Sequence, residues 1–371
     1  MNLYVGTRGG IIGAMQHATR RAFLNRTTQT AAAALFGSVA WAAPAASGRI
    51  RCGQIGTAHS HASGKMAAMR KFSDLYEVVG VVEANARRRA VAENNAAYRD
   101  VPFMTEDQLL NTRGLRMAAV ETVTDELAPT GQRCVDAGVH VHLDKPPGRT
   151  IAPLRRLLTD AAAKDLTVQL GYMFRYNPAF VFCFNAVREG WVGQVQEVHG
   201  VISKKAVGAS RPGVAEEPGG TMFELGCHLI DAMASVLGKP RTVTPFTLRT
   251  QPDGLADNQL AVFSFERATA TIRSSINDPM SNRHFTVVGD GGTVDIRPLE
   301  PPAVRLGLEN AREGYRRGWQ DVPLPKMSGR YDGDMLDLAA VIRGEKAFAF
   351  GPEHDLAVHE AVLRASELPL E

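Results

Sequence analysis

An apolar strand that runs through a glycine turn into a helix determines the architecture expected of this chain. Ile50–Ile55 is a short apolar segment, Gly56–His61 forms the turn, and apolar residues then recur at helical spacing through residue 72. The first turn of such a helix offers free backbone N–H groups and the positive end of its dipole. Both features bind a pyrophosphate, so the segment predicts a dinucleotide-binding unit.

The turn departs from the G-x-G-x-x-G pattern of a Rossmann fold. Gly56 fits the first glycine, while Ala58 replaces the second and His61 replaces the third. Alanine still permits close approach of the backbone. Histidine indicates either looser packing of the helix on the strand or a side chain turned toward the site. We predict cofactor contacts from Gly56, Thr57, Ala58 and His59.

The next strand indicates which dinucleotide binds. Residues 77–82 form a continuous apolar run, as expected for a parallel strand buried on both faces, and the run ends at Glu83. An acid at this position accepts hydrogen bonds from the adenosine ribose and repels a 2′-phosphate, which favours NAD. Three arginines follow at 87–89. Arg88 is a candidate contact for a 2′-phosphate, so NADP remains possible, and a solvated helix face is the alternative interpretation.

Three later motifs occur in a fixed order. The strand Met117–Val120 leads to Thr122, residues 139–147 contain Asp144-Lys145-Pro146, and Gly171–Pro178 reads Gly-Tyr-Met-Phe-Arg-Tyr-Asn-Pro. Together they resemble the glucose–fructose oxidoreductase / inositol dehydrogenase / MocA (Gfo/Idh/MocA) family of NAD(P)-dependent oxidoreductases. That family has an acid-Lys-Pro motif after a strand and a Gly-Tyr-x-x-Arg-x-x-Pro segment entering its substrate domain.

The resemblance covers residues 49–366 and implies an α/β protein of two domains. A Rossmann domain is expected at 49–168, and an α+β domain with a large, mostly antiparallel open sheet is expected at 169–371. The family often uses the open sheet face for self-association, which implies a homodimer or homotetramer. The resemblance also places Thr122, Asp144 and Lys145 at the cofactor, and Tyr172, Arg175 and His228 at the substrate.

The strongest chemical constellation is the triplet Glu224, His228 and Asp231, spaced i, i+4, i+7. On an α-helix this spacing places the three side chains on one face. A carboxylate one turn from an imidazole can orient the ring and support its charge after it takes a proton, as alcohol oxidation requires. The resemblance assigns His228 as general base, Glu224 as its partner, and Lys145 as the cation that polarises the reacting oxygen. Asp231 is expected to be structural.

The first 48 residues resemble a twin-arginine export leader with a linker. Thr19–Asn25 contains Arg20-Arg21, an apolar run follows from Ala31 to Ala43, and Ala40-Trp41-Ala42 offers a cleavage site. The run is about 13 residues long, too short for a stable membrane anchor. We therefore predict a periplasmic protein that is exported by the twin-arginine machinery.

Charge and cysteine spacing argue against other classes of function. Without the leader's four arginines the formal charge falls from +3 to −1, so a nucleic-acid partner is not expected. The four cysteines lack any zinc-binding spacing, and no metal site is predicted. The leading hypothesis is a dehydrogenase of a sugar, polyol or related hydroxy compound. The alternatives are a glycoside hydrolase or isomerase that uses bound NAD transiently, and a non-catalytic, cofactor-holding sugar-binding protein.

Overall fold

The structure, a computed structural model, describes residues 48–207, 211 and 218–371. The predicted export leader lies outside the described residues except for Gly48. Among the helices of the described residues, none is both long and apolar enough to cross a membrane.

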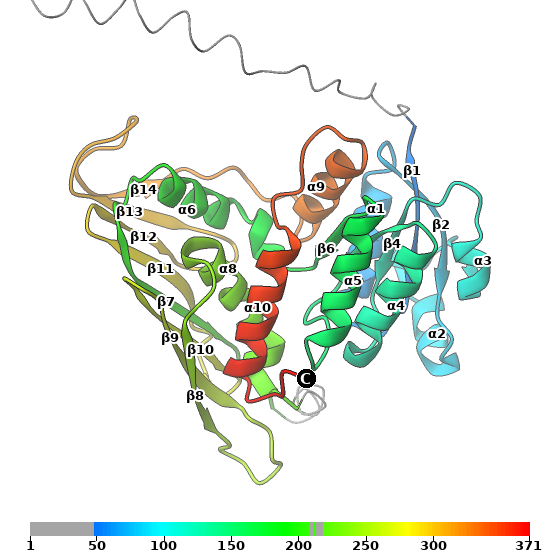
Figure 1. The fold of residues 1–371 in the computed structure, drawn as a ribbon, viewed down its shortest axis with the longest axis horizontal. Helices are drawn as coiled ribbons and strands as arrows, with labels where there is room; N and C mark the ends of the chain where they lie inside the picture. The colour runs from blue at the N-terminus through cyan, green and yellow to red at the C-terminus, as the bar shows by residue number, and fades with distance from the viewer. Residues whose placement is uncertain (1–47, 208–210, 212–217) are drawn as a thin grey trace, which may run out of the picture. The chain divides into compact units, whose positions relative to one another are not determined.

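The first half of the described chain forms a six-stranded sheet in which every pairing is parallel (Figure 1). The strand order, β3-β2-β1-β4-β5-β6, is that of a doubly wound dinucleotide-binding domain. This confirms the predicted Rossmann domain. The strands are β1 (Ile50–Ile55), β2 (Tyr76–Val82), β3 (Phe103–Met104), β4 (Met117–Val120), β5 (His140–Leu143) and β6 (Val168–Leu170).

Helices connect these strands as the apolar periodicity predicts. Helix α4 begins at Thr124 and buries Leu127, Cys134 and Val135, which recur at helical spacing. The connecting helices are α1 (Ala62–Lys71), α2 (Ala86–Glu93), α3 (Glu106–Leu110), α4 (Thr124–Asp136) and α5 (Ala152–Ala163), with a short 3₁₀ turn at Ala96–Tyr98.

The second half forms an eight-stranded sheet of order β14-β13-β12-β11-β7-β10-β9-β8. Its pairings are antiparallel except for β7 with β10, which confirms the expected large, mostly antiparallel sheet. The strands are β7 (Val195–Ser203), β8 (Thr242–Leu248), β9 (Asn258–Ser264), β10 (Thr269–Ser275), β11 (Arg283–Gly289), β12 (Gly292–Ile296), β13 (Val304–Leu308) and β14 (Gly318–Val322).

Helices of the second half cover one face of this sheet (Figure 1). One apolar core runs from Val120 and Leu143 of the first sheet through Phe180 and Ile230 to Phe285 of the second. The burial of large apolar side chains along this path joins the two halves through a common core. These helices are α6 (Pro178–Arg188), α8 (Cys227–Leu237) and α10 (Pro352–Ala365). The second half also contains a 3₁₀ turn at Met173–Tyr176 and helix α9 (Asp332–Ile342).

Helix α9, although late in the chain, packs on the first sheet. Met335, Leu338 and Ile342 share a buried cluster with Ile50 and Met66. Strand β6 also runs across the expected boundary between residues 168 and 169. The division at 1–48, 49–168 and 169–371 therefore stays a prediction.

A buried ion pair fixes α9 to α1, and its removal is expected to destabilise the fold. Lys65 Nζ lies 2.8 Å from Asp334 Oδ2, and the two side chains are 0% and 1% exposed. Asp334→Ala removes the carboxylate partner of the buried Lys65 ammonium. We therefore expect the free energy of unfolding to fall by about 3–5 kcal/mol in urea denaturation. The double variant Lys65→Met/Asp334→Leu removes both charges and should restore most of that loss. A loss below about 1 kcal/mol for Asp334→Ala would show that the pair does not hold the helices together.

Candidate active site

The glycine turn lies tightly against the end of β4. Gly56 has a φ of +91°, and a Cβ placed there would lie 2.8 Å from the backbone of Glu121 and Thr122. The backbone N–H groups of Ala58 and His59 each donate to the Glu121 carbonyl at 3.1 Å. Because the turn has a left-handed residue and no room for a side chain, only glycine fits at position 56.

Glu83, at the end of β2, accepts hydrogen bonds from the same turn. Its carboxylate accepts from Thr57 N at 2.9 Å, Thr57 Oγ1 at 2.7 Å and Asn85 N at 2.8 Å, and Arg88 Nη2 lies 3.2 Å away. Burial acts to raise the pKa of Glu83, but these hydrogen bonds lower it. Contact between Glu83 and the adenosine ribose stays a prediction. It requires one of these donors to release the carboxylate.

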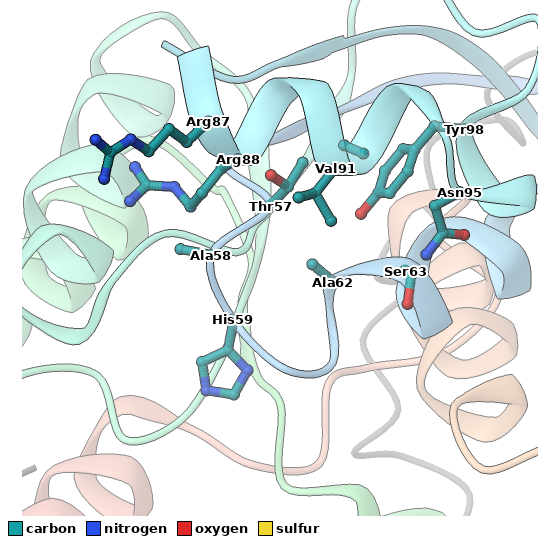
Figure 2. Close-up of a pocket in the computed structure, with 11 residues that line it drawn as sticks. Thr57, Ala58, His59, Ala62, Ser63, Arg87, Arg88, Val91, Asn95 and Tyr98 are labelled. Carbon is teal, nitrogen blue, oxygen red and sulfur yellow. The ribbon is translucent and has the colours of Figure 1, made fainter. Parts of the chain in front are cut away.

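Residues of the turn line two cavities. Figure 2 shows the larger, about 320 Å³, with Arg87 and Arg88 extending from α2 on one side and His59 projecting on another. The smaller, about 170 Å³, lies between the ends of β1, β2 and β4 and is lined by Gly56, Glu83, Arg88 and Thr122 among others. The smaller cavity, with Ile55 and Val82 in its wall and an acid at the end of β2, suits an adenosine group.

The acid of the Asp-Lys-Pro motif is the centre of a histidine cluster. Asp144 is fully buried, and its Oδ2 lies 2.8 Å from His59 Nδ1 and 3.1 Å from His61 Nδ1. Its Oδ1 accepts from the backbone N–H of Lys145 at 2.7 Å. Burial alone would raise the pKa of Asp144, but the two histidines lower it well below its usual range. His61 therefore turns its side chain toward the site, which was one of the two expectations for this position.

Glu121 is a buried residue of this site to which the sequence interpretation gave no role. No described donor reaches either of its side-chain oxygens, although the residue is fully buried. Burial, and then the neighbouring Asp144, raise the pKa of Glu121 well above its usual range. Its neutral carboxyl can share a proton with Asp144. The only sequence signal was an acid directly after a buried strand, at the edge where Rossmann domains bind ligands.

Lys145 reaches across to the second half of the chain. Its side chain is buried, and its Nζ donates to the backbone carbonyl of Glu224 at 2.7 Å. Burial acts to lower the pKa of Lys145, but Cys227, Glu224 and Asp144 together raise it above its usual value. The ammonium therefore keeps its charge at neutral pH, as its predicted role requires.

The helix that carries Glu224 and His228 is not a regular α-helix. Met222–Gly226 forms a π turn, and α8 begins only at Cys227. Hydrogen bonds of the i→i+5 type rotate the following residues away from their α-helical positions. The predicted hydrogen bond between Glu224 and His228 is consequently not formed, and Glu224 Oε2 and His228 Nδ1 both lack a partner among the described residues.

His228 lies in an aromatic and cationic environment instead. Its ring centroid is 5.5 Å from that of Phe174, 6.0 Å from Tyr172 and 6.4 Å from His61. Burial, and then the charge of Lys145, lower the pKa of His228 well below its usual value. A neutral imidazole with a free ring nitrogen is suited to accept a proton.

The predicted substrate residues separate into two groups. Tyr172 is fully buried beside His228, and its hydroxyl has no partner within the described part of the chain. Arg175 is also fully buried, but its Nη2 binds Asp231 at 2.6 Å and Asp355 at 2.5 Å. Arg175 is thus engaged in a structural ion-pair network rather than presented to a substrate, and Asp231 is structural, as expected.

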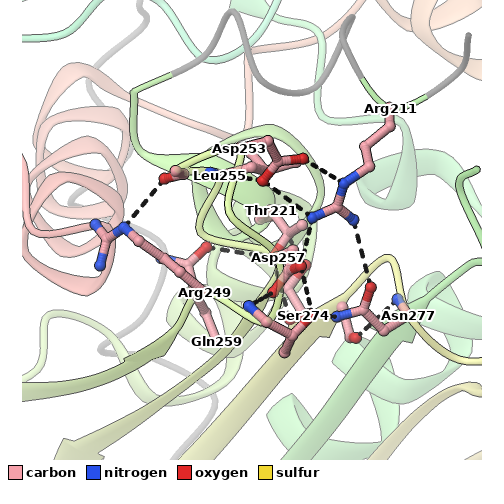
Figure 3. A network of polar contacts seen from close by, with 12 residues as sticks. Arg211, Thr221, Arg249, Asp253, Leu255, Asp257, Gln259, Ser274 and Asn277 are labelled. Atoms are coloured by element: carbon pink, nitrogen blue, oxygen red, sulfur yellow. Dashed lines mark hydrogen bonds and ion pairs between the residues drawn. The ribbon is translucent and has the colours of Figure 1, made fainter. Parts of the chain in front are cut away.

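A polar network supports the π turn from the second sheet (Figure 3). Gln259 Oε1 accepts from Met222 N at 2.8 Å, and Ser274 Oγ donates to the Thr221 carbonyl at 2.8 Å. Two residues before Gln259, Asp257 accepts from Arg211 Nη2 at 2.6 Å. The network fixes the start of the π turn and therefore the position of Glu224.

Known family models match both halves of the chain. Residues 50–172 match the model described as "Oxidoreductase family, NAD-binding Rossmann fold", and residues 183–295 match the "GFO/IDH/MocA C-terminal domain". The two matches cover well over half of the sequence.

Individual curated relatives share limited sequence identity with the chain. The chain is 29% identical over 157 residues to the uncharacterized oxidoreductase YhhX of Escherichia coli, 42% of this chain and 45% of that protein. It thus spans about half the length of the first relatives. It is 25% identical over 236 residues to an inositol 2-dehydrogenase of Salmonella paratyphi B, 62% of this chain and 68% of that protein.

Solved structures share the fold over nearly the whole described chain. The crystal structure of YhhX has a TM-score of 0.72 and 20% identity, covering 86% of this chain and 97% of that one. A UDP-N-acetylglucosamine 3-dehydrogenase from Acidithiobacillus ferrooxidans has a TM-score of 0.72 and 19% identity, covering 86% and 97%. At these identities the likeness concerns the fold alone.

Proposed function

The chain belongs to the Gfo/Idh/MocA family of oxidoreductases with an NAD-binding Rossmann domain, and from this premise we propose that it transfers hydride between a sugar, polyol or related hydroxy compound and bound NAD. NADP is the second candidate, because Arg88 lies at the cavity beside Glu83.

The observation that carries the proposal is a buried cation beside a buried neutral imidazole. Lys145 and His228 are 1% and 2% exposed, and they come from different halves of the chain. The Lys145 ammonium is suited to polarise a hydroxyl oxygen and stabilise its developing negative charge, while His228 accepts the proton. The nicotinamide, when bound, accepts the hydride. The turn at Gly56 and the cavity beside Glu83 fit the rest of that cofactor.

The choice of a hydroxy compound is supported by the chemistry of the site and by the relatives. Oxidation of an alcohol carbon needs one base and one electrophilic cation, which is the pair present here. The more distant relatives include proteins named inositol 2-dehydrogenase and trans-1,2-dihydrobenzene-1,2-diol dehydrogenase.

Self-association and export complete the proposal. On the second sheet Phe246 of β8 pairs with Leu260 of β9, and they are 55% and 36% exposed. Adjacent exposed apolar side chains on an open sheet favour burial against a second copy, so we propose a homodimer or homotetramer.

The arginine pair and apolar run of the leader support export to the periplasm with the cofactor already bound.

Cofactor release from the purified mature protein tests the function. We expect denaturation to release NAD(H) or NADP(H) at near one equivalent, identified by mass spectrometry. Incubation with sugars and polyols should then reduce the cofactor, read as absorbance of the dihydronicotinamide. Turnover of a glycoside without net reduced cofactor would instead support the transient redox cycle. Absence of bound dinucleotide, together with no binding of added NAD or NADP, would refute the oxidoreductase proposal.

A further inference from the structure

Three potential metal ligands converge beside the glycine turn. One ring nitrogen of His59, one of His61 and one carboxylate oxygen of Asp144 all lie within 4.8 Å of one another. The two histidines come from the turn between β1 and α1, and Asp144 follows β5. Two imidazoles and one carboxylate form a donor set that first-row divalent transition metals bind, with positions left open for other ligands.

The spacing of these atoms fits a common ion. For metal–ligand bonds of about 2.1 Å, adjacent ligand atoms around an octahedral ion lie roughly 3 Å apart. The separations from Asp144 Oδ2 are 2.8 Å to His59 Nδ1 and 3.1 Å to His61 Nδ1. Both imidazoles can therefore bind an ion together with Asp144 after small side-chain rotations.

Buried groups of both signs surround this point: the Lys145 ammonium follows Asp144 in the chain, and Asp144 and Glu121 are buried carboxyl groups. Glu121 adds a second fully buried carboxyl group next to Asp144, and no described donor contacts either of its oxygens. The nearby ammonium of Lys65 is already paired with Asp334 at 2.8 Å. Buried carboxyl groups without a partner are costly unless they are neutral or bind a cation. The side chains of His59 and His61 are 14% and 13% exposed, so the cluster is in contact with solvent.

We propose that His59, His61 and Asp144 bind one divalent first-row transition-metal ion. The ion lies next to the proposed catalytic groups, because the His61 ring is 6.4 Å from that of His228 and Asp144 precedes Lys145. An ion with open positions there is suited to hold an oxygen of a hydroxy substrate. This catalytic role rests on the proposed function, whereas binding of the ion does not.

Metal binding can be measured without knowing the substrate. The purified mature protein, with any histidine tag removed and stripped with a chelator, is titrated with Co²⁺ and with Zn²⁺ by calorimetry, and the Co²⁺ form is examined by visible absorption. We expect one equivalent to bind, with visible bands typical of imidazole ligands. His61→Ala and His59→Ala each remove a direct ligand, so each should weaken binding by at least the roughly 10- to 100-fold seen when an outer-shell partner is lost.

A matched control separates this site from adventitious binding. His284 lies on β11 and hydrogen-bonds Asn282, outside the cluster, so His284→Ala should bind Co²⁺ as the parent does. Circular dichroism of each variant checks that the fold is retained. Asp144→Asn removes the carboxylate charge at nearly the same side-chain volume, and it should also weaken binding of the ion. If the parent fails to bind one equivalent, or if folded His59→Ala/His61→Ala binds equally well, the cluster is only a hydrogen-bonded histidine–aspartate group. NAD binding measured on the same samples shows separately whether the dinucleotide site is intact.

Discussion

Lys145→Met is expected to lower kcat/KM by about 10³-fold, the loss typical of removing a preorganised donor from a developing oxyanion. Methionine fills a similar volume but carries no charge. Lys145 is buried and its pKa is raised, so its ammonium acts with little screening by water. Its ammonium donates a hydrogen bond to the Glu224 carbonyl, which the methionine side chain cannot replace.

The measurement compares turnover with binding in the same variant. The dissociation constant for NAD should change far less than kcat/KM, because the charge acts on the reacting oxygen. Lys164→Met removes an exposed lysine at the end of α5 and serves as the matched control, with kcat/KM expected within about twofold of the parent. If Lys145→Met retains parental kcat/KM while folded and cofactor-bound, Lys145 is not the polarising cation.

The Rossmann half was predictable because its signals are local. A parallel strand buried on both faces must be continuously apolar, and β1, β2 and β4 each begin and end within one residue of the expected position. The polar residues that follow such strands, among them Glu83 and Lys145, must then lie at one edge of the sheet. Sequence therefore located the cofactor side of the site without knowledge of the tertiary structure.

The second half was less predictable because its key contacts join distant segments. Arg175 and Asp355 are 180 positions apart, and nothing in either local pattern indicates that they pair. His359 is fully buried, with Nε2 3.1 Å from the Thr150 carbonyl 209 positions earlier. The π turn at Met222–Gly226 could not be predicted from the spacing of Glu224, His228 and Asp231, because that spacing assumes a regular α-helix.

His228→Asn is expected to lower kcat by about 10²–10⁴-fold, the usual contribution of a positioned general base. Asparagine is polar and similar in size, but it cannot accept a proton in this pH range. Because burial lowers the pKa of His228, the imidazole is already neutral and active well below pH 6.5. In the parent, the fall in kcat/KM on the acid side should therefore lie below that pH, and this fall should be absent in the variant.

Glu224→Gln distinguishes a direct base from a carboxylate–imidazole pair. In the structure Glu224 makes no hydrogen bond to His228, so its replacement is expected to lower kcat much less than His228→Asn does. His284→Asn, on β11 and away from the site, controls for replacing a histidine. Equal losses for Glu224→Gln and His228→Asn would mean that substrate binding straightens the π turn into an α-helix and forms the pair. A parental rate for His228→Asn would instead place the base elsewhere, with His61 the nearest other imidazole.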